Sequence, residues 1–129
     1  PEGVLKCMCL FVGNPHVVLQ VPSIDSIDLQ SIGVSCQTLL PEGVNVSCVE
    51  VGTADSIRLR VYERGVGETH SCASGACCAV VAAHRWGHVE KTAHVNMRGG
   101  CLTVIWDDVH KKVTQAGPVC PVYTGQFLS

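Results

Sequence analysis

Residues 72–87 read Cys-Ala-Ser-Gly-Ala-Cys-Cys-Ala-Val-Val-Ala-Ala-His-Arg-Trp-Gly. Small and apolar residues cover most faces of this stretch, so it predicts a buried helix over about 74–86. Gly87 suits the left-handed position that often ends a helix. Strand-like segments lie on both sides of this helix in the sequence. We therefore expect one α+β domain over residues 1–129, in which mostly antiparallel strands form a β-barrel around one central helix.

The predicted strands show β-branched enrichment or period-two alternation, and turn-forming residues separate them. They cover Leu5–Val12, Val17–Val21, Val44–Val51, Ser56–Glu63, Thr92–Met97, Cys101–Trp106 and Lys112–Cys120. Between the second and third strands, residues 23–32 are polar and carry Asp25 and Asp28. A loop or a short helix is predicted there.

The composition excludes several classes of protein. The chain has 129 residues, of which 47% are hydrophobic, and a net charge of −2, which suits one ordinary globular core. Basic residues are few and aromatic residues make up only 5%, so a nucleic-acid-binding surface is not expected. The apolar run at residues 7–12 is too short to span a membrane. We expect a cytoplasmic protein with a small-molecule partner.

Nine cysteines raise the question of disulfides or a metal site. Their spacings match neither zinc ribbons nor zinc fingers, and their odd number argues against a secreted disulfide scaffold, so no metal site is predicted. Most of them alternate with aliphatic residues, where free cysteine behaves as a small core hydrophobe. We therefore predict that every cysteine except Cys72 belongs to the core.

Cys72 stands at the predicted N-terminus of the central helix. Unpaired amides and the positive end of the helix dipole favour an anion there, and hence the thiolate form of a cysteine. The backbone amides of Ala73 and Ser74 point out of the helix start, and the Ser74 side chain is predicted to cap it. A substrate carboxylate bound by these amides would lie against the thiol. This arrangement suits removal of a proton beside a carboxylate.

Polar residues elsewhere in the chain are candidates for the same site. Glu63 and Arg64 end a strand, and the following glycine-rich turn brings the chain back, so Glu63 is predicted to take the thiol proton and Arg64 to bind a carboxylate. Asn14 and His16 flank Pro15 between two apolar segments, where a plain loop is the alternative. Asn45 is unusual inside a strand and needs hydrogen-bond partners if it is buried.

Several motifs together resemble diaminopimelate epimerase, in the order found in that family. They are Gly13-Asn14-Pro15-His16, Val44-Asn45-Val46, Glu63-Arg64-Gly65-Val66-Gly67-Glu68-Thr69, Cys72-Ala73-Ser74-Gly75-Ala76-Cys77, Arg98-Gly99-Gly100, and Gly117-Pro118 through Tyr123-Thr124-Gly125. The block at 63–69 followed by Cys72 is highly specific. The Gly-Asn-Pro-His string alone is only suggestive.

The resemblance implies a two-cysteine epimerase that interconverts LL- and meso-diaminopimelate without pyridoxal phosphate or a metal. Cys72 matches the second of the two cysteines, and Glu63 and His16 match residues that assist the thiol chemistry. A third group matches residues that bind substrate: Asn14, Asn45, Glu63 and Arg64, with the amides of Ala73 and Ser74. Tyr123 matches a tyrosine used in dimerisation.

The resemblance also implies that these residues correspond to the C-terminal lobe of a two-lobed enzyme. No other cysteine here lies in a Cys-Gly-Asn-Gly type helix start, the motif that carries the first catalytic cysteine in the family. We therefore expect the isolated chain to have negligible epimerase activity and to form a dimer. Ala73 and Ser74 replace a more usual Gly-Thr pair, and the methyl group of Ala73 narrows the approach of a ligand.

Three alternative functions fit the sequence less well. A non-catalytic dimerisation or regulatory module would have no need of Glu63, Arg64 and Asn45. Another cofactor-independent isomerase of the fold, such as a proline racemase or a phenazine-biosynthesis relative, is expected to lack the block at 63–69. A cysteine protease is weakest, because only His70 lies near Cys72 in the sequence and no glutamine-bearing oxyanion motif accompanies it.

Overall fold

A computed structural model describes residues 6–129. This part of the chain contains eight strands, two α-helices and one short 3-10 helix. The elements follow in the order β1 Lys6–Phe11, β2 Pro15–Gln20, α1 Leu29–Cys36, η1 Gln37–Leu39, β3 Asn45–Thr53, β4 Ser56–Glu63, β5 Gly67–Thr69, α2 Ala73–Arg85, β6 Thr92–Met97, β7 Gly100–Asp107 and β8 Lys112–Ala116. Leu5, the first residue of the predicted first strand, lies outside the described residues.

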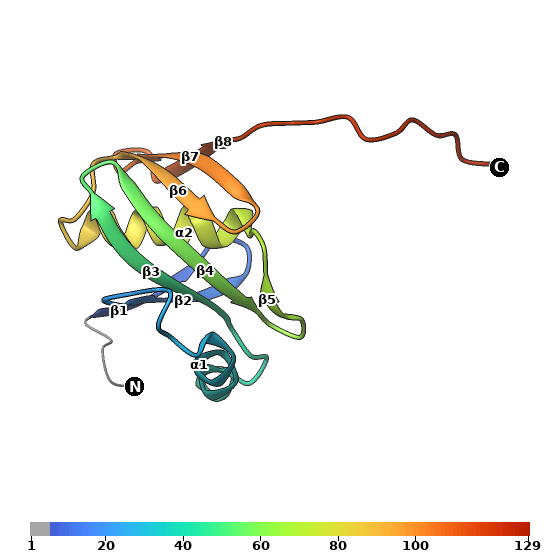
Figure 1. Ribbon diagram of the computed structural model, residues 1–129. Helices are drawn as coiled ribbons and strands as arrows, with labels where there is room; N and C mark the ends of the chain where they lie inside the picture. Colours follow the sequence, from blue (N-terminus) through green and yellow to red (C-terminus); the bar gives the residue numbers. More distant parts are fainter. Residues whose placement is uncertain (1–5) are drawn as a thin grey trace.

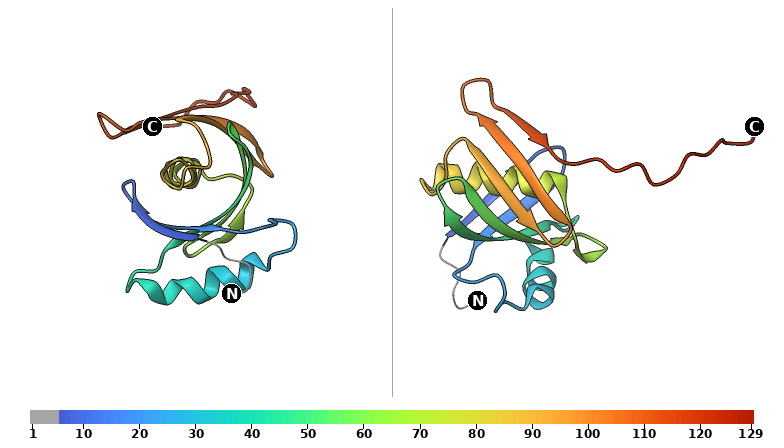
Figure 2. Two further views of the ribbon diagram at one scale, coloured as in Figure 1. Left: turned by 90° about the vertical axis from the view of Figure 1, so that its left-hand side faces the viewer. Right: turned by 45° about the horizontal axis from the view of Figure 1, so that its top comes forward.

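All eight strands join in one sheet that curls around α2 (Figures 1 and 2). The order is β1-β2-β3-β4-β6-β7-β8, and β5 pairs with β4. Most pairings are antiparallel, but β2 with β3 and β4 with β6 are parallel. The predicted sheet around a central helix is thus confirmed, as a mixed half-barrel whose end strands are β1 and β8.

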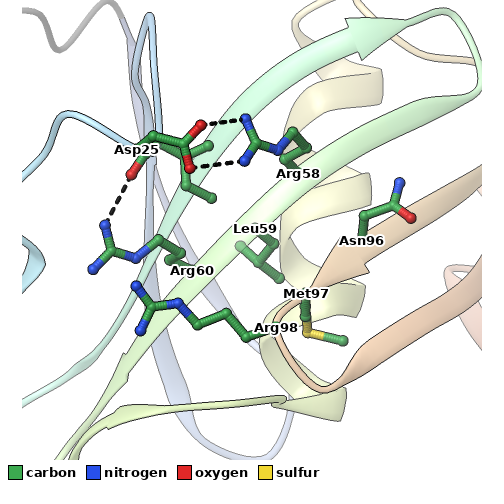
Figure 3. Close-up of a pocket in the computed structure, with 8 residues that line it drawn as sticks. Asp25, Arg58, Leu59, Arg60, Asn96, Met97 and Arg98 are labelled. Atoms are coloured by element: carbon green, nitrogen blue, oxygen red, sulfur yellow. Dashed lines mark hydrogen bonds and ion pairs between the residues drawn. The ribbon is translucent and has the colours of Figure 1, made fainter.

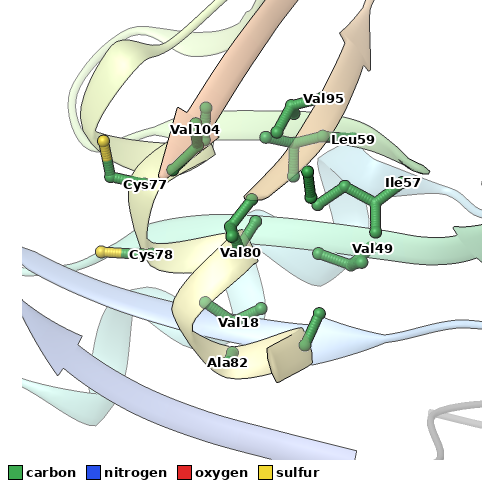
Figure 4. Close-up of a cluster of buried hydrophobic side chains, with 14 of the residues drawn as sticks. Val18, Val49, Ile57, Leu59, Cys77, Cys78, Val80, Ala82, Val95 and Val104 are labelled. Atoms are coloured by element: carbon green, nitrogen blue, oxygen red, sulfur yellow. The ribbon is translucent and has the colours of Figure 1, made fainter. Parts of the chain in front are cut away.

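Helix α2 forms the centre of the main hydrophobic core. Residues 75–83 of the helix are all buried, which explains why this stretch of sequence has no polar stripe. Its partners are inward-facing aliphatic side chains of the sheet (Figure 4). They include Val18 of β2, Val49 of β3, Ile57 and Leu59 of β4, Val95 of β6 and Val104 of β7. Gly87 has φ +81° just after the helix, as predicted.

A second helix, α1, covers part of the outer face of the sheet. The sequence predicted a loop or short helix at residues 23–32, but the helix begins only at Leu29 and ends at Cys36. The Asp28 side chain caps it by accepting a hydrogen bond from the amide of Ser31. Gly33 allows close contact with β4, because a Cβ there would lie 2.2 Å from a ring carbon of Tyr62.

Strands β2 and β3 are buried on both faces, because α2 covers one side of the sheet and α1 the other. Val18 and Val49 belong to the core around α2, whereas Val17, Leu19 and Cys48 belong to a second core under α1. In β2 this double burial explains the continuous apolar run at residues 17–19. Strand β3 is less uniform, because it contains Asn45, Ser47 and Glu50.

The C-terminal segment corrects one predicted strand. Strand β8 ends at Ala116, although the sequence pattern extended it to Cys120. Gly117 and Pro118 follow, and both residue types are disfavoured in strands. Beyond them the chain runs away from the half-barrel (Figure 1), and its large apolar side chains are exposed. Tyr123, the candidate dimerisation residue, lies in this exposed segment.

The prediction that all cysteines except Cys72 are core residues was wrong for five of them. Only Cys48, Cys77 and Cys78 among those eight are buried; Cys7, Cys9, Cys101 and Cys120 are exposed and Cys36 is half-buried. The exposed ones lie on the outward face of β1, on β7 and in the C-terminal segment. Their alternation with aliphatic residues resembles that of core positions, but no other element of the described structure covers them. Cys72, conversely, is itself buried within the core around α2.

Candidate active site at the N-terminus of helix α2

One end of the half-barrel gathers most of the predicted site residues. Strands β2 and β3 are parallel and both begin there, β4 ends there, and α2 begins there. Their terminal residues therefore lie close together although they are far apart in the sequence. The hydrogen bonds below link Asn14 and His16 to the start of α2, and Asn45 to the end of β4.

Cys72 is the N-cap residue of α2. Its backbone is extended, with φ −145° and ψ 113°, and its sulfur accepts a hydrogen bond from the amide of Gly75 at 3.3 Å. The sequence assigned the cap to Ser74, but Ser74 lies inside the first turn. The amide of Ala76 bonds to the Cys72 carbonyl oxygen, whereas the amides of Ala73 and Ser74 have no acceptor among residues 6–129. Two free donors thus point out beside the thiol.

The Ser74 hydroxyl connects the thiol to two polar residues at the start of β2. Its Oγ lies 3.6 Å from Cys72 Sγ, 3.0 Å from His16 Nε2 and 3.5 Å from Asn14 Nδ2. Asn14 and His16 also contact each other, with 3.2 Å between Oδ1 and Nε2. Sequence reasoning missed this role of the Ser74 side chain, because the spacing of 58 residues between His16 and Ser74 carries no local pattern.

His16 is almost completely buried, with 1% of its surface exposed. Burial lowers the pKa of its imidazole, and the negative charge of Glu63 opposes that shift only in part. Its Nδ1 atom is buried without a hydrogen-bond partner among the described residues. A second proton on the ring would therefore have no acceptor at Nδ1.

Asn45 ties two strand ends together. Its Nδ2 donates to the carbonyl oxygen of Pro15 at 3.2 Å, and its Oδ1 accepts from the amide of Arg64 at 2.9 Å. The side chain is buried, so the expectation that a strand asparagine must find partners is confirmed. Asn45 fixes the end of β4 against the start of β2.

Glu63 and Arg64 lie at this end but make contacts different from those expected. The Glu63 carboxylate accepts a hydrogen bond from the Thr69 hydroxyl. No hydrogen bond joins Glu63 to Cys72 among residues 6–129. The Arg64 guanidinium is exposed and donates to the carbonyl oxygen of Glu42 at 3.3 Å. Thr69 is a second residue that sequence reasoning did not single out.

A groove of about 420 Å³ opens beside the start of α2. Ser71 and Ala73 line one side, and the turn between β6 and β7 lines the other, with Gly99 held by a 2.8 Å hydrogen bond from its amide to the carbonyl oxygen of His70. Within the described part of the chain, no cluster of three or more His, Cys, Asp or Glu side chains is arranged to hold a metal ion. No described helix is long and apolar enough to cross a membrane.

A second cavity, of about 230 Å³, lies on the face of β4 that is turned away from α2 (Figure 3). Three arginines line it, but each is paired: Arg58 with Asp25 at 2.8 Å, and Arg60 and Arg98 with Glu68 at 2.8 and 3.1 Å. Arg58 also pairs with Glu50 at 3.3 Å, so three carboxylates balance the three arginines. The cavity therefore lacks the uncompensated positive charge that an anion site needs.

Most of this chain matches a known protein family. The family model for diaminopimelate epimerase matches residues 8–122. Diaminopimelate epimerases from strains of Coxiella burnetii are 38% identical to this chain over 127 residues, which is 97% of this chain and 46% of each relative. The chain thus spans about half the length of the curated relatives it matches.

Solved structures support the fold. A phenazine biosynthesis protein of the PhzF family from Enterococcus faecalis superposes on 74% of this chain and 35% of its own length, with a TM-score of 0.59 and 15% identity. A Bacillus anthracis protein of the same family covers 86% of this chain and 38% of its own length, with a TM-score of 0.57 and 17% identity. These identities show a shared fold alone. The matching family model and the relatives of 38% identity go further: this chain belongs to the diaminopimelate epimerase family.

Proposed function

We propose that this chain is one domain, the C-terminal lobe of a cytoplasmic diaminopimelate epimerase, and that Cys72 is one of its two acid/base thiols. The observation that carries the proposal is the placement of the Cys72 sulfur beside the free amides of Ala73 and Ser74. Membership of the family supplies the substrate class.

In the proposed reaction the two amides bind the α-carboxylate of diaminopimelate, which sets the α-carbon against the Cys72 sulfur. One thiolate removes the α-proton, and a thiol on the opposite face returns a proton, so the configuration inverts. The helix N-terminus stabilises the negative charge that spreads onto the carboxylate in the transition state. No cofactor takes part in this scheme.

The remaining polar residues take supporting roles in the proposal. Asn14, Asn45, Glu63 and Arg64 line the end of the half-barrel where the rest of the substrate extends, with Arg64 suited to a carboxylate once its guanidinium leaves the Glu42 carbonyl oxygen. Glu63 assists Cys72 after a movement that releases it from Thr69. The second thiol belongs to the complementary half of the enzyme, because no other cysteine here lies in a matching helix start.

The test uses a chimera in which this chain replaces the matching 127-residue segment of the Coxiella burnetii relative. We expect it to form meso-diaminopimelate from the LL isomer, and Cys72→Ala to abolish that activity. Cys7→Ala is the matched control, because this exposed cysteine on β1 has no role in the proposal. The chain alone should form no product. Turnover by the chimera that survives Cys72→Ala would contradict the proposal.

Dimerisation is a separate part of the proposal. Val119, Val122, Tyr123 and Phe127 are each at least 87% exposed in the C-terminal segment, and such a run of apolar side chains favours burial against another subunit. Light scattering should show a homodimer of the chimera. A monomer at high concentration would contradict this part alone.

A further inference from the structure

We infer that the neutral His16 ring acts on Cys72 through the Ser74 hydroxyl, as a hydrogen-bond donor that stabilises the thiolate, so that His16 and Ser74 are positioning residues. This inference takes its catalytic meaning from the proposed function. Its test measures thiol reactivity, however, and is independent of epimerase turnover.

The direction of the hydrogen bonds follows from Asn14. The Asn14 Oδ1 atom lies 3.2 Å from His16 Nε2 and can only accept, so Nε2 must carry a proton to avoid facing one lone pair with another. That same N–H is 3.0 Å from Ser74 Oγ. Asn14 Nδ2, at 3.5 Å, adds a second donor toward the same oxygen.

The Ser74 hydroxyl hydrogen is then free to point elsewhere. Two donors already face its oxygen, and among residues 6–129 the other atom within hydrogen-bond distance of it is Cys72 Sγ at 3.6 Å. Donation to this sulfur places Ser74 O–H and Gly75 N–H on the same atom. Two donors favour the ionised form of the sulfur over the neutral thiol.

The buried side of His16 supports the same tautomer. Nδ1 has no partner among the described residues, and a buried N–H without an acceptor costs more than a buried lone pair. Protonation of both nitrogens would leave that N–H unpaired. This agrees with the lowered pKa of the ring. His16 is therefore suited to donating a hydrogen bond and poorly suited to taking up a proton from Cys72 through Ser74.

The experiment measures alkylation of Cys72 by iodoacetamide at neutral pH in the full 129-residue chain, resolved by mass spectrometry of the modified peptides. Ser74→Ala removes the donor to the sulfur, and we expect alkylation of Cys72 to slow about three- to tenfold. Losing one hydrogen bond to an ionised group lowers the thiolate population by roughly tenfold or more. The remaining thiolate is more nucleophilic, which offsets part of that loss.

Conservative variants separate a donor from a base. Ser74→Thr keeps the hydroxyl and should restore the wild-type rate. His16→Gln places an amide N–H near the position of Nε2 and should stay within about twofold of the wild type, whereas His16→Ala should behave like Ser74→Ala. Ser71→Ala, an exposed serine outside these hydrogen bonds, and alkylation of Cys101 in every variant serve as controls.

Each outcome decides the inference. An unchanged Cys72 rate in folded Ser74→Ala would overturn it. A rate for His16→Gln as low as that for His16→Ala would instead show that the ring acts as a base. Circular dichroism and thermal unfolding establish whether each variant is folded. If a variant of the buried His16 does not fold, Ser74→Ala still tests the inference, because Ser74 is half-exposed. Failure of the epimerase assay would leave these rates unaffected.

Discussion

Arg60 and Glu68 face each other on the outer surface of neighbouring strands, joined by two parallel hydrogen bonds of 2.8 and 2.9 Å. Only 13% of the Arg60 side chain is exposed, and its guanidinium also donates to the carbonyl oxygen of Ile24. This pair fastens β5, and with it the turn that leads to Cys72, onto β4.

Arg60→Met should lower the free energy of unfolding by about 1–3 kcal/mol, because it leaves a half-buried carboxylate without its main partner. Urea titration measures this change. Arg58→Met is the matched control two residues along the same strand. Its pair with Asp25 is well exposed on both sides and should contribute at most about 1 kcal/mol. Equal losses in the two variants would contradict this difference.

Replacing Gly33 tests how α1 packs on the sheet. A Cβ at this position would lie 2.2–2.7 Å from ring atoms of Tyr62, closer than real contacts allow. Gly33→Ala should therefore destabilise the fold by about 1–3 kcal/mol, even though alanine favours a helix by roughly 1 kcal/mol. Val34→Ala, at an exposed position on the same helix, should change stability by less than about 0.5 kcal/mol. Tm and urea midpoints report both, and a stabilised Gly33→Ala variant would refute this account of the contact.

Removal of the Asn45 side chain should weaken the site end of the sheet. Asn45→Ala leaves the Arg64 amide and the Pro15 carbonyl oxygen without their partner, at an expected cost of about 1–3 kcal/mol in unfolding free energy. Hydrogen exchange should show faster exchange at the Arg64 amide. Asn96→Ala, whose exposed side chain bonds to the Ser56 hydroxyl, should change neither quantity appreciably.

The buried His16 ring should make stability depend on pH. Its pKa in the folded protein lies below the ordinary value of 6.5, so below about pH 6.5 the unfolded chain takes up a proton that the folded chain does not. The free energy of unfolding should therefore fall as the pH falls below 6.5, until the folded ring also titrates, with a slope of up to about 1.4 kcal/mol per pH unit. His16→Gln should remove this component in urea titrations at a series of pH values. If His16→Gln showed the same pH dependence as the wild type, His16 would not be the source of this component.

The sequence predicted the central helix and most strands because their burial imposes simple patterns. Residues 75–83 are all small or apolar and all buried, because the curled sheet packs around most of the helix. Helix α1 was harder to predict, since its stability comes from a cap at Asp28 and from contact between Gly33 and the distant Tyr62. The end of β8 was missed because apolar residues continue past Pro118 into a segment that packs on nothing in the described structure.

In the candidate site, too, the features set by local sequence could be predicted and those set by distant contacts could not. The location of Cys72 at a helix start could be predicted from local sequence, and so could the need of Asn45 for partners. The link from His16 through Ser74 to Cys72 could not, because it depends on the register of β2 against β3 and on how α2 sits on them. The contact of Glu63 with Thr69 likewise depends on the pairing of β4 with β5.

The central claim is that Cys72 handles the α-proton on one face of diaminopimelate. The most direct test is deuterium incorporation at the α-carbon, followed by NMR in D₂O with the Coxiella burnetii chimera carrying Cys72→Ala. One thiol then remains, and it can remove and return a proton only on its own face. We predict that one stereoisomer still exchanges its α-hydrogen without inversion, while the other does not exchange. Equal exchange of both stereoisomers in this variant would contradict the claim.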